Sequence, residues 1–262
     1  MKLFYREYGK GEPIIITHGL FGMSDNWIPI AKKLAENFKV YLPDMRNHGN
    51  SPHSEIHTYD AMSNDILEFI EDRNIKNAIF AGHSMGGKAV LQFAEKFPER
   101  VTKMIIIDIS PEKYIPDEKF FKKALNHKLL LEKLKTVNLE LPDNRKELNE
   151  LITLEFQNPF ISQLILKNIR KNNERFYWKI NIAALYKHLY EMQRKIKLTE
   201  KVKDIKTLFI FGGNSPYFNK NDKVYIKTVL PKSEIKIIPD VGHLIHIENE
   251  NELIKRIFSF TD

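Results

Sequence analysis

FAGHSMGG, residues 80–87, is the stretch of this sequence that decides the expected fold. It follows a short β-type run at 77–81 and precedes a helix-type run at 88–96. The pattern G-x-S-x-G between a strand and a helix is typical of a sharp turn that presents a serine hydroxyl at the edge of a sheet. Glycines are needed beside that turn because a Cβ would collide with the opposing backbone. The motif therefore predicts that Ser84 is a nucleophile, rather than a buried serine in a glycine-rich helix start.

The rest of the chain alternates between β-type and helical patterns around this motif. The interval 1–8 is typical of an edge strand, and five further apolar runs predict strands at 14–17, 40–42, 104–107, 208–211 and 235–238. Helical spacing is found at 27–38, 59–72, 222–230 and 250–260. This alternation predicts an α/β protein with a mostly parallel central sheet and helices on both faces.

One long segment interrupts the alternation. From residue 112 to 202 the strand patterns vanish, and the sequence becomes helical and rich in Lys, Leu, Glu and Asn. We expect two parts, a core formed by 1–111 and 203–262 and a helical cap, 112–202, inserted over the sheet.

Composition narrows the class of protein. The chain has 262 residues, 42% of them hydrophobic, and no cysteine, which excludes disulfides and cysteine-based chemistry. No segment reaches the roughly 18 apolar residues of a membrane span, so a cytoplasmic protein without a membrane partner is expected. The formal net charge of +7 is attributed mainly to solvated surface, because the lysines are scattered through helical stretches alongside glutamates. Attraction of an anionic substrate is the less favoured alternative, and no nucleic-acid recognition motif accompanies the charge.

A serine hydroxyl needs a neighbouring base, and His243 is the candidate for that role. It lies just past the last predicted strand, beside Gly242, at an edge of the sheet where strand ends meet. His246 completes an H-x-x-H pair, but no further metal ligands accompany it, so a structural role is expected and no metal is implied.

Three aspartates could orient the base. Asp108 is favoured because it follows three isoleucines, where an isolated carboxylate needs a partner. Asp222 stands at a probable helix start, where capping explains it, and Asp240 is the weakest candidate. The segment 212–217, which follows a strand that often carries this acid, contains no carboxylate.

Further residues are expected to surround Ser84, His243 and the acid. The backbone N–H groups of Leu20 and Met85 are expected to form the oxyanion hole. An apolar substrate pocket could be lined by Phe21 and Trp27 and roofed by Phe156 and Trp178, although aromatic residues are as often plain core. His18 is expected to be structural, and Asp44 and Arg46 are expected to form an ion-pair network that braces the loops of the site.

Five motifs occur together in this order: HGLFG (18–22), D-x-RNHG-x-S (44–51), GHSMGGK (82–88), DISP (108–111) and GGNSPY (212–217). Together they resemble the YbfF-like esterase branch of the α/β-hydrolase superfamily, over nearly the whole chain. The resemblance implies that Asp108 is the acid. It also implies hydrolysis of esters and acyl thioesters, including acyl-CoA, without a metal or organic cofactor.

The function expected is therefore a serine hydrolase that cleaves short to medium acyl esters through a Ser84-His243-Asp108 triad and an acyl-enzyme. Its partner would be a small-molecule ester or acyl thioester. Two alternatives remain open. One is an acyl-CoA thioesterase or a lyase that uses the same triad, and the other is a non-catalytic ligand-binding protein that keeps the fold. The oligomeric state is left open.

Overall fold

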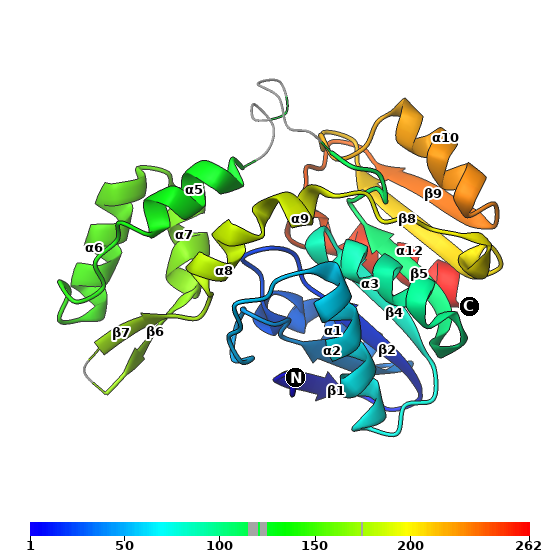
Figure 1. Cartoon of the computed structure of the whole chain (residues 1–262), viewed down its shortest axis with the longest axis horizontal. Helices are drawn as coiled ribbons and strands as arrows, with labels where there is room; N and C mark the ends of the chain where they lie inside the picture. Colours follow the sequence, from blue (N-terminus) through cyan, green and yellow to red (C-terminus); the bar gives the residue numbers. More distant parts are fainter. Residues whose placement is uncertain (115–119, 121–124, 174) are drawn as a thin grey trace.

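A seven-stranded sheet lies at the centre of the structure, a computed structural model that describes residues 1–114, 120, 125–173 and 175–262 (Figure 1). The strand order is β1-β3-β2-β4-β5-β8-β9, and β1 runs antiparallel to β3 at one edge while the other pairs are parallel. The strands are β1 (Tyr5–Tyr8), β2 (Glu12–Thr17), β3 (Phe38–Pro43), β4 (Ala78–His83), β5 (Val101–Ile107), β8 (Lys206–Gly212) and β9 (Ser233–Ile238). The predicted α/β class and mostly parallel sheet are confirmed.

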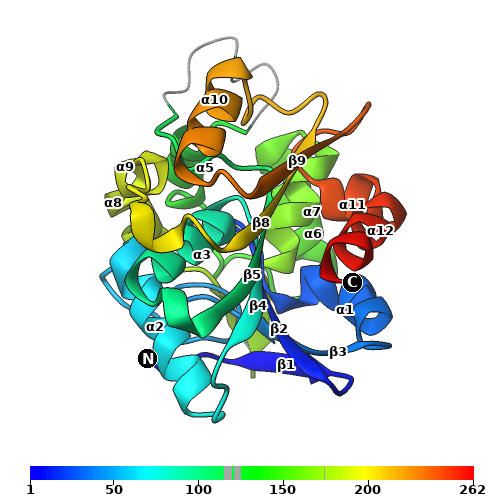
Figure 2. The ribbon, with the colours of Figure 1, turned by 90° about the vertical axis from the view of Figure 1, so that its right-hand side faces the viewer.

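Helices cover both faces of this sheet (Figure 2). One face carries α1 (Ile28–Leu34), α11 (Ile245–Glu248) and α12 (Glu250–Thr261), and the other carries α2 (Tyr59–Glu71), α3 (Met85–Lys96) and α10 (Lys220–Val229). Short 3-10 turns are found at Ser24–Trp27, Pro98–Arg100 and Glu200–Val202. Within the described part of the chain, no helix has both the length and the apolar character needed to cross a membrane.

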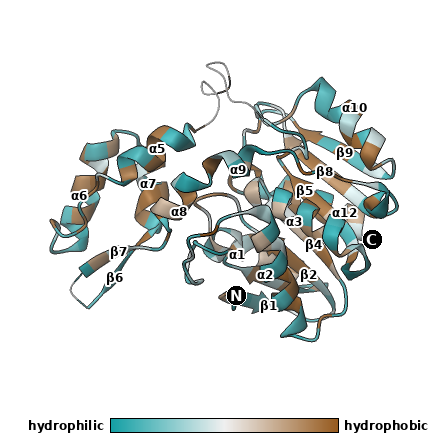
Figure 3. Ribbon diagram, viewed as in Figure 1, coloured by the Kyte–Doolittle hydropathy of each residue, from teal (hydrophilic) through white to brown (hydrophobic). Residues whose placement is uncertain are grey.

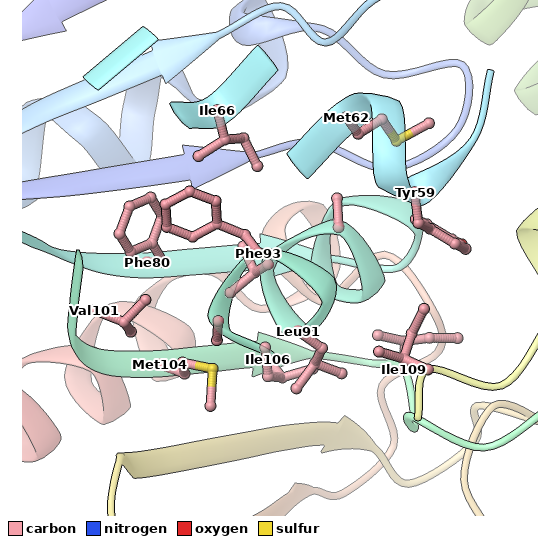
Figure 4. Close-up of a cluster of buried hydrophobic side chains, with 14 of the residues drawn as sticks. Tyr59, Met62, Ile66, Phe80, Leu91, Phe93, Val101, Met104, Ile106 and Ile109 are labelled. Carbon is pink, nitrogen blue, oxygen red and sulfur yellow. The ribbon is translucent and has the colours of Figure 1, made fainter. Parts of the chain in front are cut away.

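Each central strand is apolar without interruption because both of its faces are buried. In β4, Ile79 and Ala81 join the hydrophobic cluster of one face, and Phe80 between them joins that of the other. The central strands are accordingly hydrophobic along their length (Figure 3). Phe80 packs on Phe93 of α3, with ring centroids 4.7 Å apart, beneath Ile66 of α2 (Figure 4). Truncating a buried Phe of this kind to Ala costs about 3–5 kcal/mol, so this packing holds α3 firmly on the sheet.

Most of the described segment between β5 and β8 lies beside the sheet, where most of its buried residues from Leu130 to Leu189 form a separate hydrophobic cluster (Figure 1). Its described helices are α5 (His127–Leu134), α6 (Arg145–Phe156), α7 (Pro159–Lys167), α8 (Ile182–Lys187) and α9 (Leu189–Gln193). The expectation that this segment lacks strands is wrong, because β6 (Ile169–Asn172) and β7 (Arg175–Trp178) pair as an antiparallel hairpin. Strands of four residues are too short to show a clear alternating pattern, and Asn173 supplies the left-handed turn conformation with φ 50°.

Candidate active site

Ser84 occupies the turn between β4 and α3 in a conformation that side chains rarely adopt, with φ 53° and ψ −118°. A Cβ at Gly82 would lie 2.5 Å from the Gly86 carbonyl oxygen, and one at Gly86 would lie 2.5 Å from the Thr17 carbonyl oxygen. The Thr17 hydroxyl lies 3.0 Å from the Gly86 carbonyl oxygen and donates to it, which ties β2 to the turn. Because the surrounding backbone packs this closely, it can hold the serine in its strained conformation at the carboxyl end of the sheet.

His243 lies between Ser84 and Asp108. Its Nε2 is 3.1 Å from Ser84 Oγ, and its Nδ1 is 2.6 Å from Asp108 Oδ2. A hydroxyl can donate to Nε2 only when that nitrogen carries no proton, so the arrangement fits the tautomer in which Nδ1–H donates to the carboxylate. The fold thus brings together three side chains that are up to 159 positions apart in the sequence.

Asp108 is fully buried at the end of β5, and its own backbone has a positive φ of 51°. Its Oδ1 accepts the Gly212 N–H at 2.8 Å, and its Oδ2 accepts the Ser215 hydroxyl as well as the imidazole of His243. A buried carboxylate is stable only when such donors surround it. Three donors from two distant segments therefore hold this acid in one orientation.

The two other candidate acids lie elsewhere. Asp222 belongs to the capping box of α10, where its carboxylate accepts the Asn219 N–H at 2.8 Å. Asp240 is exposed in the turn after β9, with φ 58°. Helix capping and turn formation account for both residues, as the sequence had suggested for Asp222.

Aromatic and neutral histidine rings surround the imidazole of His243. Tyr217 stacks on it with ring centroids 4.2 Å apart and 27° between the planes. On another side, the His83 Nε2–H donates to the His243 carbonyl oxygen at 2.9 Å, and burial lowers the pKa of His83 well below its usual value. Trp27 stacks on His246, with centroids 4.7 Å apart. In the part of the chain that the structure describes, no three His, Cys, Asp or Glu side chains are grouped so that they could hold a metal ion.

The loop after β2 approaches the serine closely. A Cβ on Gly19 would lie 3.3 Å from Ser84 Cβ, so only glycine allows this approach. The neighbouring N–H groups have partners: that of Phe21 donates to His48 Nε2 at 3.3 Å, and that of Gly22 donates to the Gly19 carbonyl at 3.0 Å. Among the described residues, the N–H of Leu20 has no hydrogen-bond partner. It is therefore free to bind an oxygen atom placed beside the serine.

Met85 supplies the second N–H of this kind. It is the first residue of α3, so its N–H is one of the donors that a helix leaves unpaired at its start. Within the described residues nothing accepts it. The helix macrodipole adds positive potential at the same point.

The loop Asp44–Ser51 is braced by polar groups, but not by the pair that the sequence suggested. Arg46 forms a bidentate ion pair with Asp65 of α2, at 2.6 and 2.7 Å. Asp44 instead accepts the backbone N–H groups of Ser24 and Asn50, at 2.6 and 2.8 Å. The expected Asp44–Arg46 pair is therefore wrong, because Arg46 extends to the buried carboxylate of a helix that sequence spacing did not associate with the loop.

His18 makes two hydrogen bonds within the same group of loops. Its Nε2 accepts the Met45 N–H at 2.9 Å, so its Nδ1 carries the proton and donates to the Gly19 carbonyl oxygen at 2.8 Å. Burial lowers the pKa of this histidine to about 4. A neutral ring with both nitrogens engaged positions the loop and is not available as a base.

A cavity of about 650 Å³ opens onto Ser84 and His243. Phe21 and Trp27 are among its lining residues, as the sequence suggested. Phe156 and Trp178 are not among the described lining residues. Both pack against the hydrophobic cluster of the segment between β5 and β8. The cavity is instead lined from that segment by Leu125, His127 and four residues of α7, namely Phe160, Gln163, Leu164 and Lys167.

Sequence reasoning did not identify three residues that contact the site. Ser215 and Tyr217 belong to the segment after β8, which was noted because it lacks a carboxylate. His83 is the variable position inside the G-x-S-x-G motif. The absence of an acid after β8 could have pointed to Ser215. When β5 supplies the acid instead, the segment after β8 still lies beside that acid and can contact it.

Comparison with known proteins shows the family of this chain. The family profile described as "alpha/beta hydrolase fold" matches residues 12–250. The chain is 30% identical over 256 residues to the sn-1-specific diacylglycerol lipase ABHD11 of Xenopus laevis, covering 96% of this chain and 80% of that protein. It is 29% identical over 250 residues to esterase YbfF of Escherichia coli K12, covering 95% and 92% of the two chains.

A solved structure is similar to this chain over nearly its whole length. That of a marine microorganism esterase superposes with a TM-score of 0.92 at 35% sequence identity, and the match covers 99% of both chains. The segment between β5 and β8 falls within this coverage.

Proposed function

Because the chain belongs to the α/β-hydrolase family and is a carboxylic-ester hydrolase, we propose that Ser84, His243 and Asp108 are its catalytic triad. The observation that carries this proposal is the hydrogen-bonded chain from Ser84 Oγ through the imidazole to the buried carboxylate. Each link has the length and order that activation of a serine requires.

The steps of the reaction follow from these hydrogen bonds. Ser84 Oγ attacks the acyl carbon while its proton passes to His243 Nε2, and Asp108 stabilises the imidazolium that forms. When the tetrahedral intermediate collapses, His243 returns the proton to the leaving alcohol, and the acyl group stays on the serine. Water then loses a proton to His243 and attacks the ester, which releases the acid and restores the serine hydroxyl.

The N–H groups of Leu20 and Met85 are proposed as the oxyanion hole. Both lie beside Ser84 without a partner among the described residues, and Met85 adds the positive end of α3. Donors fixed in this way stabilise the charge that develops on the carbonyl oxygen in the transition state.

The cavity supports short to medium acyl esters as substrates. Its volume of about 650 Å³ lies within the range of small-molecule sites, and Phe21, Trp27 and Leu164 give it apolar walls. We assign residues 112–202 to a cap, because α7 forms one wall of the cavity while most of the buried hydrophobic residues of the described segment pack into a cluster of their own. An acyl thioester could be cleaved by the same residues. Comparing kcat/KM for an ester and a thioester of the same acyl group shows which substrate is preferred.

The test is hydrolysis of p-nitrophenyl butyrate by the wild-type chain, Ser84→Ala and a control, Ser63→Ala. Ser63 is a buried serine of α2 whose hydroxyl has no partner among the described residues. We expect turnover by the wild type and the control, and essentially none by Ser84→Ala. A fluorophosphonate probe should label the wild type at Ser84. Unchanged turnover in Ser84→Ala would discard the triad, and an unlabelled folded protein would favour a non-catalytic binding role.

A further inference from the structure

Among the described residues that line the cavity, Lys167 is the only lysine or arginine. It is the last residue of α7, and its side chain makes no ion pair or hydrogen bond with any described residue. Its charge adds to burial and to the charge of His243 in lowering the pKa of His246 to about 3. The ammonium group is therefore near enough to the cavity wall for its field to act on a lining side chain.

The position of Lys167 in the cavity wall is set by its neighbour, Asn168. The Asn168 side-chain amide donates to the Leu164 carbonyl oxygen of α7 and to the Phe21 carbonyl oxygen, both at 2.9 Å. Phe21 follows the proposed oxyanion-hole residue Leu20. The carboxyl end of α7 is thus tied directly to the loop that borders the reaction centre.

Among the described residues that line the cavity, no other ionisable side chain forms an ion pair with Lys167. The carboxylate of Glu248 is already engaged, since it accepts the N–H groups of Gly242 and Leu244 at 2.6 and 3.1 Å. Burial lowers the pKa values of His18, His83, His127 and His246, so these rings are neutral at pH 7. A cation at a mostly apolar cavity, with no ion-pair partner in the described part of the chain, favours an anionic ligand there.

The charge distribution of the whole chain also favours an anionic ligand. Residues 112–202 hold 19 of the 41 lysines and arginines but 12 of the 34 aspartates and glutamates. The remainder of the chain holds 22 of each, so the formal net charge of +7 belongs entirely to the cap. Such a field raises the local concentration of anions near the cavity that the cap borders.

On the premise of the proposed ester hydrolysis, we propose that Lys167 is a specificity-determining residue that selects esters carrying a second, anionic group. The chemical class is an ester with a carboxylate held away from the scissile bond, which the ammonium binds while Ser84 attacks. The carboxylate could belong to the acyl part, as in the half-ester of a dicarboxylic acid, or to the alcohol part.

Two matched pairs of substrates show whether the carboxylate belongs to the acyl part or to the alcohol part. Release of acid is followed by pH-stat. Monoethyl adipate against ethyl hexanoate places the charge on a six-carbon acyl chain. Carboxymethyl butyrate against propyl butyrate places it on the alcohol. The quantity to compare is the ratio of kcat/KM for the anionic ester to that for its neutral partner. Because intrinsic reactivity cancels between enzyme variants, a change in this ratio reports recognition of the charge.

In at least one pair, Lys167→Met should lower this ratio roughly tenfold, the size expected for losing one charge-assisted contact. Lys167→Arg should retain most of it, and added salt should weaken it in the wild type. The matched control is Lys146→Met, which removes the same charge from an exposed position on α6 that is not among the lining residues.

The proposal is overturned if Lys167→Met leaves both ratios unchanged, or if Lys146→Met lowers them equally. The second result would assign the preference to the general field of the cap. Loss of all hydrolysis, of neutral esters included, in the wild-type chain would instead contradict the proposed function. The two failures are therefore distinguishable.

Discussion

Asp108, at the end of β5, is hydrogen-bonded to Gly212, at the end of the neighbouring strand β8, through the Gly212 N–H at 2.8 Å. The same carboxylate accepts the hydroxyl of Ser215 and faces His243. The orientation of an acid supplied by one strand thus depends on the backbone and loop of the next. This relationship explains why a segment without a carboxylate still belongs to the site.

Replacing the acid tests its role most directly. Asp108→Asn keeps the shape of the side chain but presents an amide that can no longer hold the proton on Nδ1. We expect kcat to fall about 10³-fold or more, with the fold retained. Asp222→Asn is the control, because Asp222 caps α10 and makes no hydrogen bond with Ser84, His243 or Asp108, so kcat should stay close to that of the wild type. The reverse pattern would transfer the role of the acid to Asp222.

Ser215→Ala removes one donor from Asp108 and leaves the triad intact. Losing a hydrogen bond to a charged group costs about 1.5 kcal/mol or more, so kcat should fall roughly tenfold. KM should change little, since Ser215 is not among the described residues that line the cavity. Ser162→Ala, a buried serine of α7, serves as the control. An unchanged kcat in Ser215→Ala would show that Gly212 and His243 suffice to orient the acid.

Lys88 of α3 connects the helix after Ser84 to two points of the segment between β5 and β8. Its fully buried ammonium donates to the carbonyl oxygens of Glu112 and Arg194, at 2.9 and 2.5 Å. Burial lowers its pKa from 10.5 to about 7. Between these two pH values the unfolded chain binds more protons than the folded one, so this group makes stability rise with pH, by at most about 1.4 kcal/mol per unit.

Urea unfolding of the wild type and Lys88→Met between pH 6 and 10 measures this contribution. The difference in unfolding free energy, wild type minus variant, should be flat below about pH 7 and should rise above it. Subtracting the variant removes the titration of the other lysines. Parallel profiles over the whole range would mean that the lysine titrates alike in the folded and unfolded chains.

Phe160 and Phe156 lie in different surroundings, one in the cavity wall and the other on the hydrophobic cluster between β5 and β8. Phe160 is 53% exposed and lines the cavity, so Phe160→Ala should lower kcat/KM for p-nitrophenyl butyrate several-fold and barely change stability. Phe156 packs on the cap cluster, so Phe156→Ala should cost about 1–3 kcal/mol of stability with little effect on kcat/KM. Equal effects on activity would place both residues in contact with substrate.

The sequence alone determined the class of fold, and it predicted two residues of the proposed triad. Continuous apolar runs arise because parallel strands are buried on both faces, and helical spacing reports one buried face, so both patterns are local properties. Ser84 and His243 were predictable because G-x-S-x-G and a histidine after the last strand have fixed places in a parallel sheet. Asp108 could be favoured over Asp222, since three isoleucines and a capping position are also visible in the chain.

Only the tertiary structure decided which side chains meet. The partner of Arg46 proved to be Asp65, Ser215 and Tyr217 proved to contact Asp108 and His243, and a hairpin appeared between β5 and β8. It also assigned Phe160, rather than Phe156 or Trp178, to the cavity wall. The physical reason is that periodicity specifies which face of an element is buried. What that face touches depends on how distant elements pack together.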